Sequence, residues 1–180
     1  PLTFSLRAYR ELKRRVGDFD VVQDNQTLGY GVLGIQRYFP VVGTIHHPIS
    51  VDRRIELQNA EGWKRYSLRR WYGFVRMQAY VAARLNPILT VSESSLADIH
   101  RDFNVPQRNM RLIPLGVDTR YFHPRPHLPK RPGSIVAVAS ADSPMKGVAT
   151  LLHAVAKVAT ERDVNLTVVS RPTPGGPTER

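Results

Sequence analysis

Short apolar, β-branched segments alternate with longer helical segments along this chain of 180 residues. The apolar segments cover residues 20–24, 41–45, 88–91, 111–113, 135–139 and 166–169. They show little of the polar–apolar alternation of half-exposed strands, so both faces of each strand are expected to be buried. The pattern predicts an α/β fold with Rossmann-like parallel sheets covered by helices.

Apolar residues between these segments recur at helical spacing and predict core-facing helix stripes. One stripe holds Val148, Leu151, Leu152, Val155 and Val158, and another holds Leu68, Trp71, Tyr72, Val75, Ala79 and Ala82. Residues 5–15 already have the pattern of a basic helix, and the chain does not begin with Met. We therefore expect an internal piece of a longer protein.

Four prolines and a glycine fall within residues 123–133, where they oppose both helix and strand. We interpret this segment as an interdomain linker. Residues 1–122 then form part of one domain with four strands, and residues 134–180 form the start of a second. Two strands are too few for a doubly wound sheet, so the second domain is expected to be truncated.

The charge balance is strongly basic: 26 Lys and Arg against 15 Asp and Glu give a net charge of +11. Nucleic acid, anionic lipid and phosphorylated small molecules are the partners that this charge favours. Residues 52–84 are basic and aromatic. They fit either a helix lying on an anionic membrane or a core helix with a solvated basic face. No apolar run is long enough to predict a membrane span.

Lys146 and Gly147 follow the segment 135–139 and a short loop, and a helix is expected to begin near Val148. Backbone N–H groups at a helix start, together with a lysine charge, suit a phosphate group. The alternative is a solvated lysine at a helix start. The glycine pattern of a Walker loop is absent.

Two further features follow the first two predicted strands. Gly29–Gly34 matches G-x-G-x-x-G, which suggests either a dinucleotide site or glycines that permit a tight turn and close helix packing. His46 and His47 end the segment 41–45, where ligands bind in open α/β sheets. Either imidazole could hydrogen-bond a hydroxyl or a phosphate, or have no role. A metal site is not expected, because a third ligand is missing.

Three motifs together resemble the family-4-type retaining glycosyltransferases of the GT-B fold. They are Val91-Ser92-Glu93-Ser94, Ile113-Pro114-Leu115-Gly116-Val117-Asp118 with Phe122 and Pro124 following, and Lys146-Gly147. Residues 24–31 also look like an acceptor-domain loop of some members, and the similarity covers nearly the whole chain. The order of the motifs agrees with an acceptor-side domain, a linker and the start of a donor-binding domain, and Ser92 in the first motif is expected to cap a helix.

The resemblance implies a hexosyltransferase-like enzyme that moves a sugar from a nucleotide-sugar donor to an acceptor with retention of configuration. It implies no obligatory metal and no cofactor. Lys146 and Gly147 would bind the donor diphosphate, and His46 would be the catalytic-site residue near the transferring sugar. The acceptor-side loop would contribute Asp24, Asn25, Gln26 and Gly29.

Several positions depart from the family pattern. Ser140 and Ala141 replace the usual glycine and arginine before the lysine, and Leu115 replaces an asparagine. The family's glycine-rich first loop and paired-glutamate segment are not in this sequence, so the isolated piece is predicted to be inactive.

The basic charge predicts an anionic or lipid-linked acceptor. The alternative use of this charge is peripheral attachment to an anionic membrane. The expected location is cytoplasmic, with any such contact at the inner face of the membrane. The alternative is a basic noncatalytic module that binds nucleic acid or another polyanion. Nucleic acid is not the expected partner, because no recognised nucleic-acid-binding signature is present.

Overall fold

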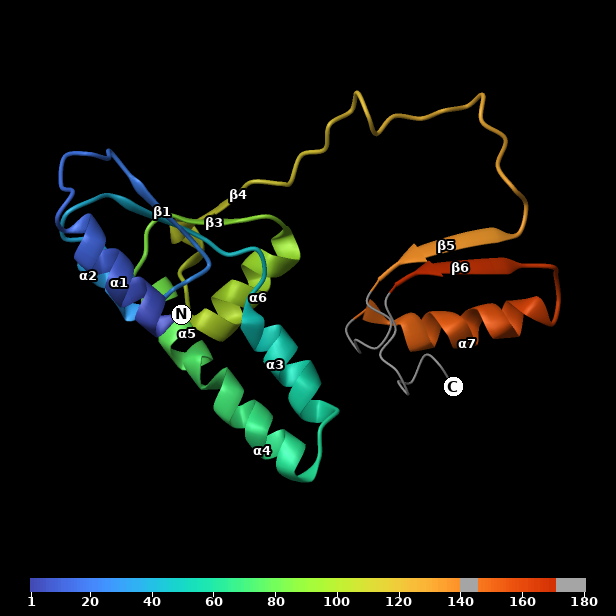
Figure 1. Ribbon diagram of the computed structural model, residues 1–180, viewed down its shortest axis with the longest axis horizontal. Helices are drawn as coiled ribbons and strands as arrows, with labels where there is room; N and C mark the ends of the chain where they lie inside the picture. Colours follow the sequence, from blue (N-terminus) through green and yellow to red (C-terminus); the bar gives the residue numbers. More distant parts are fainter. Residues whose placement is uncertain (140–145, 171–180) are drawn as a thin grey trace. The chain divides into compact units, whose positions relative to one another are not determined.

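The computed structural model describes residues 1–139 and 146–170. The chain divides into two compact units, Pro1–Gly116 and Val117–Arg180, called here the N-terminal and C-terminal units (Figure 1). Each unit is described by itself.

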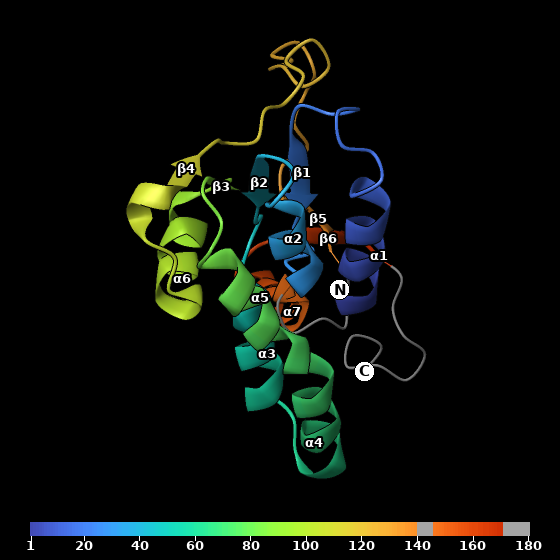
Figure 2. The same ribbon diagram turned by 90° about the vertical axis from the view of Figure 1, so that its left-hand side faces the viewer.

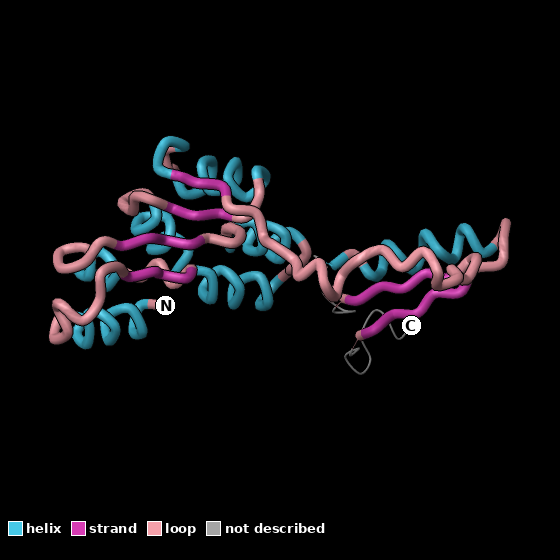
Figure 3. The backbone as a smooth tube through the Cα atoms, turned by 90° about the horizontal axis from the view of Figure 1, so that it is seen from above, coloured by secondary structure: helices cyan, strands magenta, loops and turns pink. Residues whose placement is uncertain are grey.

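Four parallel strands form the sheet of the N-terminal unit in the order β1-β2-β3-β4 (Figure 3). Their bounds are β1 (Val22–Asn25), β2 (Val41–Thr44), β3 (Ile88–Thr90) and β4 (Met110–Leu112). Val22 pairs with Val41, Gly43 with Ile88, and Ile88 with Met110. These strands lie within one or two residues of the predicted segments, so the predicted α/β fold with parallel sheets is confirmed.

Helices connect and cover these strands. They are α1 (Leu2–Leu12), α2 (Tyr30–Ile35), α3 (Ile49–Gln58), α4 (Gly62–Trp71), α5 (Val75–Ala82) and α6 (Glu93–Phe103), with short 3-10 turns η1 (Tyr72–Phe74) and η2 (Gln107–Asn109). Helices α1 and α2 pack together, and α5 contacts both α2 and α6. Helices α3 and α4 lie side by side and extend away from the sheet (Figures 1 and 2).

The core of the N-terminal unit lies between the sheet and these helices. Its fully buried side chains include Leu28, Ile45, Val81, Leu85, Ile88, Ile99 and Val105. Burial of such aliphatic side chains stabilises the fold by roughly 1.5–3 kcal/mol each, as an upper estimate. The core therefore holds the carboxyl ends of the strands in a fixed arrangement.

Two residues of the predicted core-facing stripes are exposed, Trp71 in the N-terminal unit and Val158 in the C-terminal unit. Val158 lies near the end of its helix and has 40% of its surface exposed. Trp71 has 71% of its surface exposed, whereas Tyr72 and Val75 are buried. The predicted stripe assumed one continuous α-helix through these residues. Helix α4 instead ends at Trp71, and the 3-10 turn η1 has a different angle per residue, so the α-helical spacing does not continue.

Glycines bring α1 and α2 into close contact. A Cβ on Gly29 would overlap the Ser5 hydroxyl, a Cβ on Gly31 would overlap the Ser5 carbonyl, and one on Gly34 would press on the Tyr9 ring. Of the two interpretations of Gly29–Gly34, close helix packing is therefore the one that these contacts support.

The C-terminal unit contains two parallel strands joined by a helix. Strand β5 (Ser134–Val138) pairs with β6 (Asn165–Val169), and α7 (Val148–Ala159) connects them. The prediction that both faces of each strand are buried is wrong for these two strands, because exposed residues alternate with half-buried ones along both and Val136 and Val138 are 65% and 79% exposed. Residues 113–133 form no helix or strand and are exposed. The predicted phosphate loop at 140–145 and the turn-rich residues 171–176 lie outside the described residues.

Candidate functional site

The carboxyl ends of β1 and β2 bring the predicted acceptor-side residues together. Asn25 ends β1 and pairs with Thr44, which ends β2. Gln26 follows directly after β1, and His46 lies two residues after the end of β2. Because the strands are parallel, the loops after them emerge at the same edge of the sheet. This edge is the candidate site of the N-terminal unit.

Asn25 orients the imidazole of His46. Their Oδ1 and Nε2 atoms lie 2.9 Å apart. Because an amide oxygen only accepts hydrogen bonds, Nε2 of the neutral ring carries the proton. Among the described residues, none contacts the Nδ1 atom through a hydrogen bond. The exposed ring can therefore accept a hydrogen bond from a ligand hydroxyl at Nδ1.

The side chain of Gln26 hydrogen-bonds to the backbone of His46 and His47. Its Oε1 atom accepts a hydrogen bond from the His46 N–H at 2.9 Å, and its Nε2 atom donates to the His47 carbonyl at 2.8 Å. The buried Gln78 of α5 in turn donates to the Gln26 and Thr27 carbonyls, each at 3.3 Å. The sequence analysis selected Gln26 but missed Gln78. The sequence feature that could have indicated Gln78 is a polar residue on the buried, otherwise apolar face of a helix.

Two other predicted loop residues have structural contacts. Asp24 is 8% exposed, and its Oδ2 atom accepts a hydrogen bond from the Leu28 N–H at 2.8 Å. Gly29 precedes α2 and lies against Ser5 of α1. The exposed Asn25 and the half-buried Gln26 are therefore the loop residues that lie beside His46, while Asp24 and Gly29 shape the loop.

Helix α6 supports the same edge through serines. Ser92 caps the helix by accepting a hydrogen bond from the Ser95 N–H at 3.1 Å. The Ser95 hydroxyl donates to the His46 carbonyl at 2.9 Å. The sequence motif indicated Ser92 as a cap, but the tertiary contact of Ser95 had no sequence signal.

His47 faces a different partner from His46. Its Nε2 atom lies 2.9 Å from Asp52 Oδ1, in the first turn of α3. This contact fixes the ring of His47 against α3. The two adjacent histidines are thus held by different elements, and only His46 keeps the contact with Asn25.

Lys146 and Gly147 lie at the start of α7 in the C-terminal unit. Gly147 is the helix cap with φ of 64°, a left-handed conformation that favours glycine. No atom of residues 1–139 and 146–170 lies within 4 Å of where its Cβ would be, and its left-handed backbone conformation by itself favours glycine. Lys146 is exposed at the amino end of the helix, where a phosphate is favoured.

Residues 1–139 and 146–170 contain neither a metal-ligand cluster nor a membrane-spanning helix. No group of three or more His, Asp or Glu side chains there is arranged to hold a metal ion. Within the same ranges, every helix is too short or too polar to cross a bilayer.

Comparison with known proteins agrees with these observations. Residues 1–121 match Glycosyltransferase Family 4. The whole chain is 52% identical to an MMP α-(1→4)-mannosyltransferase of Mycolicibacterium hassiacum and spans 44% of the length of that relative. The family match covers the four-stranded sheet and its helices, including His46 and the elements that hold it. This chain belongs to glycosyltransferase family 4.

Proposed function

We propose that this chain supplies the acceptor-side domain and the start of the donor-binding domain of a retaining mannosyltransferase. The donor would be a nucleotide-activated mannose, and the transfer would form an α-(1→4) linkage. The observation that carries this proposal is the 52% identity, along the entire chain, to an α-(1→4)-mannosyltransferase. The same identity favours a transferase over a noncatalytic module that binds nucleic acid or another polyanion.

His46 would contact the transferring sugar on the acceptor side. Its Nε2 atom is engaged by Asn25, so Nδ1 is the atom that can accept a sugar hydroxyl proton in a hydrogen bond. Gln26 and Ser95 hold the backbone of this residue from two sides. A ring held in this way loses little conformational freedom when substrate binds, which favours the reacting geometry.

Lys146 and Gly147 would bind the donor diphosphate. Departure of the nucleoside diphosphate places negative charge on its phosphate oxygens, and a lysine beside a helix amino terminus stabilises that charge. The exposed Lys146 and the left-handed Gly147 at the start of α7 support this assignment. Neither a metal ion nor a cofactor is required for this stabilisation.

Sugar transfer by the complete protein tests the proposal. GDP-mannose and UDP-mannose would be offered with an α-mannoside acceptor, and the anomeric configuration of the product would be read by NMR at early times. We expect His46→Ala and Lys146→Ala each to lower kcat/KM by about 10²-fold, as for loss of a transition-state contact. Lys157→Ala, at the far end of α7, is the control. Inversion of configuration, or unchanged rates in both variants, would overturn the proposal.

Residues 1–180 alone are expected to be inactive, because the paired-glutamate segment that the family resemblance implies is outside this sequence. An assay of the isolated chain checks this expectation. Measurable transfer by these residues would show that the donor sugar is bound without that segment.

A peripheral membrane contact is a further part of the proposal. Helix α4 exposes Trp63, Tyr66 and Trp71, with exposed fractions of 79%, 55% and 71%, beside basic side chains. Exposed tryptophan and tyrosine among cations suit the interface of an anionic membrane. Cosedimentation with phosphatidylcholine vesicles, with and without phosphatidylglycerol, tests it. Binding should require phosphatidylglycerol and weaken in Trp63→Ala; absence of this lipid dependence would remove the membrane contact.

A further inference from the structure

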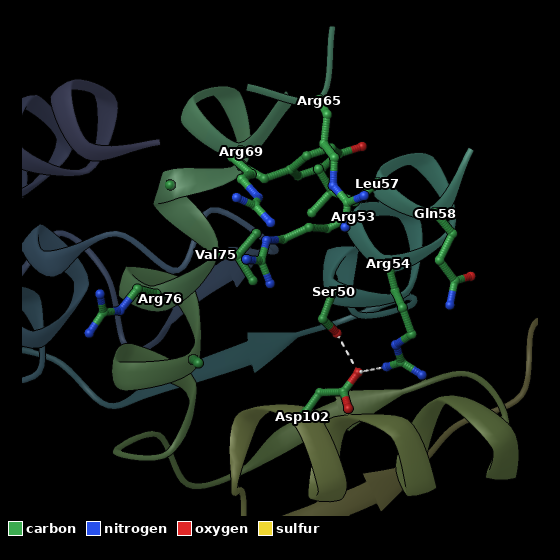
Figure 4. Close-up of a pocket in the computed structure, with 13 residues that line it drawn as sticks. Ser50, Arg53, Arg54, Leu57, Gln58, Arg65, Arg69, Val75, Arg76 and Asp102 are labelled. Atoms are coloured by element: carbon green, nitrogen blue, oxygen red, sulfur yellow. Dashed lines mark hydrogen bonds and ion pairs between the residues drawn. The ribbon is translucent and has the colours of Figure 1, made fainter. Parts of the chain in front are cut away.

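A cavity of about 690 Å³ opens between α3, α4 and α5, with Asp102 of α6 at its edge (Figure 4). Five arginines line it: Arg53, Arg54, Arg65, Arg69 and Arg76. None of the residues predicted to bind the donor diphosphate or the acceptor lines this cavity. Its volume lies within the range of small-molecule sites, roughly 300–1,000 Å³.

The arginines reach the cavity from three helices, with Arg76 on α5. Arg65 and Arg69 are four residues apart on α4, so they share the face that lies against α3. Arg53 extends from α3, and Figure 4 shows the guanidinium groups of these three residues pointing toward one another. Like charges at this spacing repel, so the arrangement costs free energy unless an anion lies among them.

The carboxylate at the edge does not neutralise these three arginines. Asp102 Oδ2 accepts hydrogen bonds from Ser50 and Arg54, each at 2.7 Å, and Arg101 binds Oδ1 of the same group. In the described ranges, the side chains of Arg53, Arg65, Arg69 and Arg76 form no ion pair or hydrogen bond. Four guanidinium groups with their donors unused therefore face one cavity.

Two buried side chains also line the cavity. Tyr72 and Val75 contribute to it and are 5% and 7% exposed. Burial, followed by the neighbouring Glu56 carboxylate, raises the pKa of Tyr72 to about 12. The phenol therefore stays neutral near physiological pH and adds no negative charge that could compete with a bound anion.

We propose that this arginine-lined cavity binds a ligand carrying phosphoryl groups. Guanidinium forks donate paired hydrogen bonds to phosphate oxygens, and several such forks around one cavity suit a multiply charged group better than a single carboxylate. All residues that line this cavity belong to the N-terminal unit, and the proposal does not depend on the transfer reaction proposed above. The phosphoryl group could belong to a soluble phosphate ester or to a lipid headgroup, since both offer the same oxygens.

Titration calorimetry on the complete protein tests the site. All titrations use a Lys146→Ala background, so that the predicted donor-diphosphate residue does not contribute. Inorganic pyrophosphate probes a soluble source, and monomeric dihexanoyl phosphatidylglycerol probes a lipid headgroup. The pocket variants are Arg53→Gln and Arg69→Gln, with Arg65→Gln as a third. The matched control is Arg70→Gln, which removes the neighbouring arginine of α4 that does not line the cavity.

We expect each pocket variant to weaken binding of pyrophosphate or of the lipid headgroup by about tenfold, which corresponds to about 1.4 kcal/mol. Arg70→Gln should leave the affinity unchanged. The probe that shows this dependence identifies the source of the phosphoryl group. No binding of either probe, or equal weakening by Arg69→Gln and Arg70→Gln, would overturn the proposal. These arginines are exposed, so circular dichroism spectra of all variants should match that of the parent protein.

Discussion

Asn25 at the end of β1 holds the imidazole of His46 beyond the end of β2, with 2.9 Å between Oδ1 and Nε2. The two residues are far apart in sequence and meet because parallel strands end at one edge of the sheet. The contact leaves Nδ1 as the ring atom that can accept a further hydrogen bond.

Asn25→Ala should therefore lower sugar transfer without unfolding the protein. Loss of the amide frees the ring of His46, and we expect kcat to fall by about tenfold, as for loss of one hydrogen bond. In nitrogen NMR spectra, the Nε2-protonated tautomer should lose population. Asn59→Ala, at the end of α3 and away from His46, is the control. An unchanged tautomer ratio in Asn25→Ala would contradict this role.

Gly31→Ala should destabilise the N-terminal unit. A Cβ there would overlap the Ser5 carbonyl of α1, and backbone atoms cannot move aside as a flexible side chain can. We expect a loss of about 1–3 kcal/mol in the free energy of unfolding, typical of overpacking. Gly73→Ala is the matched control, because no atom of the described part of the chain lies within 4 Å of its Cβ position. Urea unfolding followed by circular dichroism measures both, and equal stabilities would refute the close-packing argument.

Ser92→Ala should remove the amino-terminal cap of α6. The Ser92 hydroxyl accepts a hydrogen bond from the Ser95 N–H at 3.1 Å, and loss of such a cap costs about 1 kcal/mol. Ser67→Ala, on the exposed surface of α4, should have little effect. Thermal unfolding of the two variants distinguishes a specific cap from a general effect of serine. A cap with no energetic role would leave both variants with the same melting temperature.

The Asp102 carboxylate should make stability depend on pH. Hydrogen bonds from Arg101 and Ser50, and the charge of Arg54, lower its pKa from 3.8, although burial opposes the shift. A depressed pKa in the folded state stabilises the protein above the unfolded value, and this contribution is lost as pH falls below about 4. Asp102→Asn should therefore be less stable than the parent at neutral pH, and the difference should shrink on acidification. A difference that is constant between neutral and acidic pH would rule out this linkage.

Sequence periodicity by itself determined the strands, their parallel arrangement and most helices. Buried parallel strands need continuous apolar segments, and helices that cover a sheet need an apolar stripe, so both leave local patterns. The cap at Ser92 and the glycine at Gly147 were also readable, because helix ends have strong local residue preferences. Trp71 was misplaced because the 3-10 turn that begins at Tyr72 leaves no such pattern.

Only the tertiary structure decided which polar side chains meet. The contacts of His46 with Asn25, Gln26 and Ser95 join two strand ends and a helix, and the arginine cavity joins residues from four helices. Such contacts depend on strand order and on how helices pack, which are long-range properties. Local sequence patterns record which face of an element is buried, but they do not record which neighbour covers it.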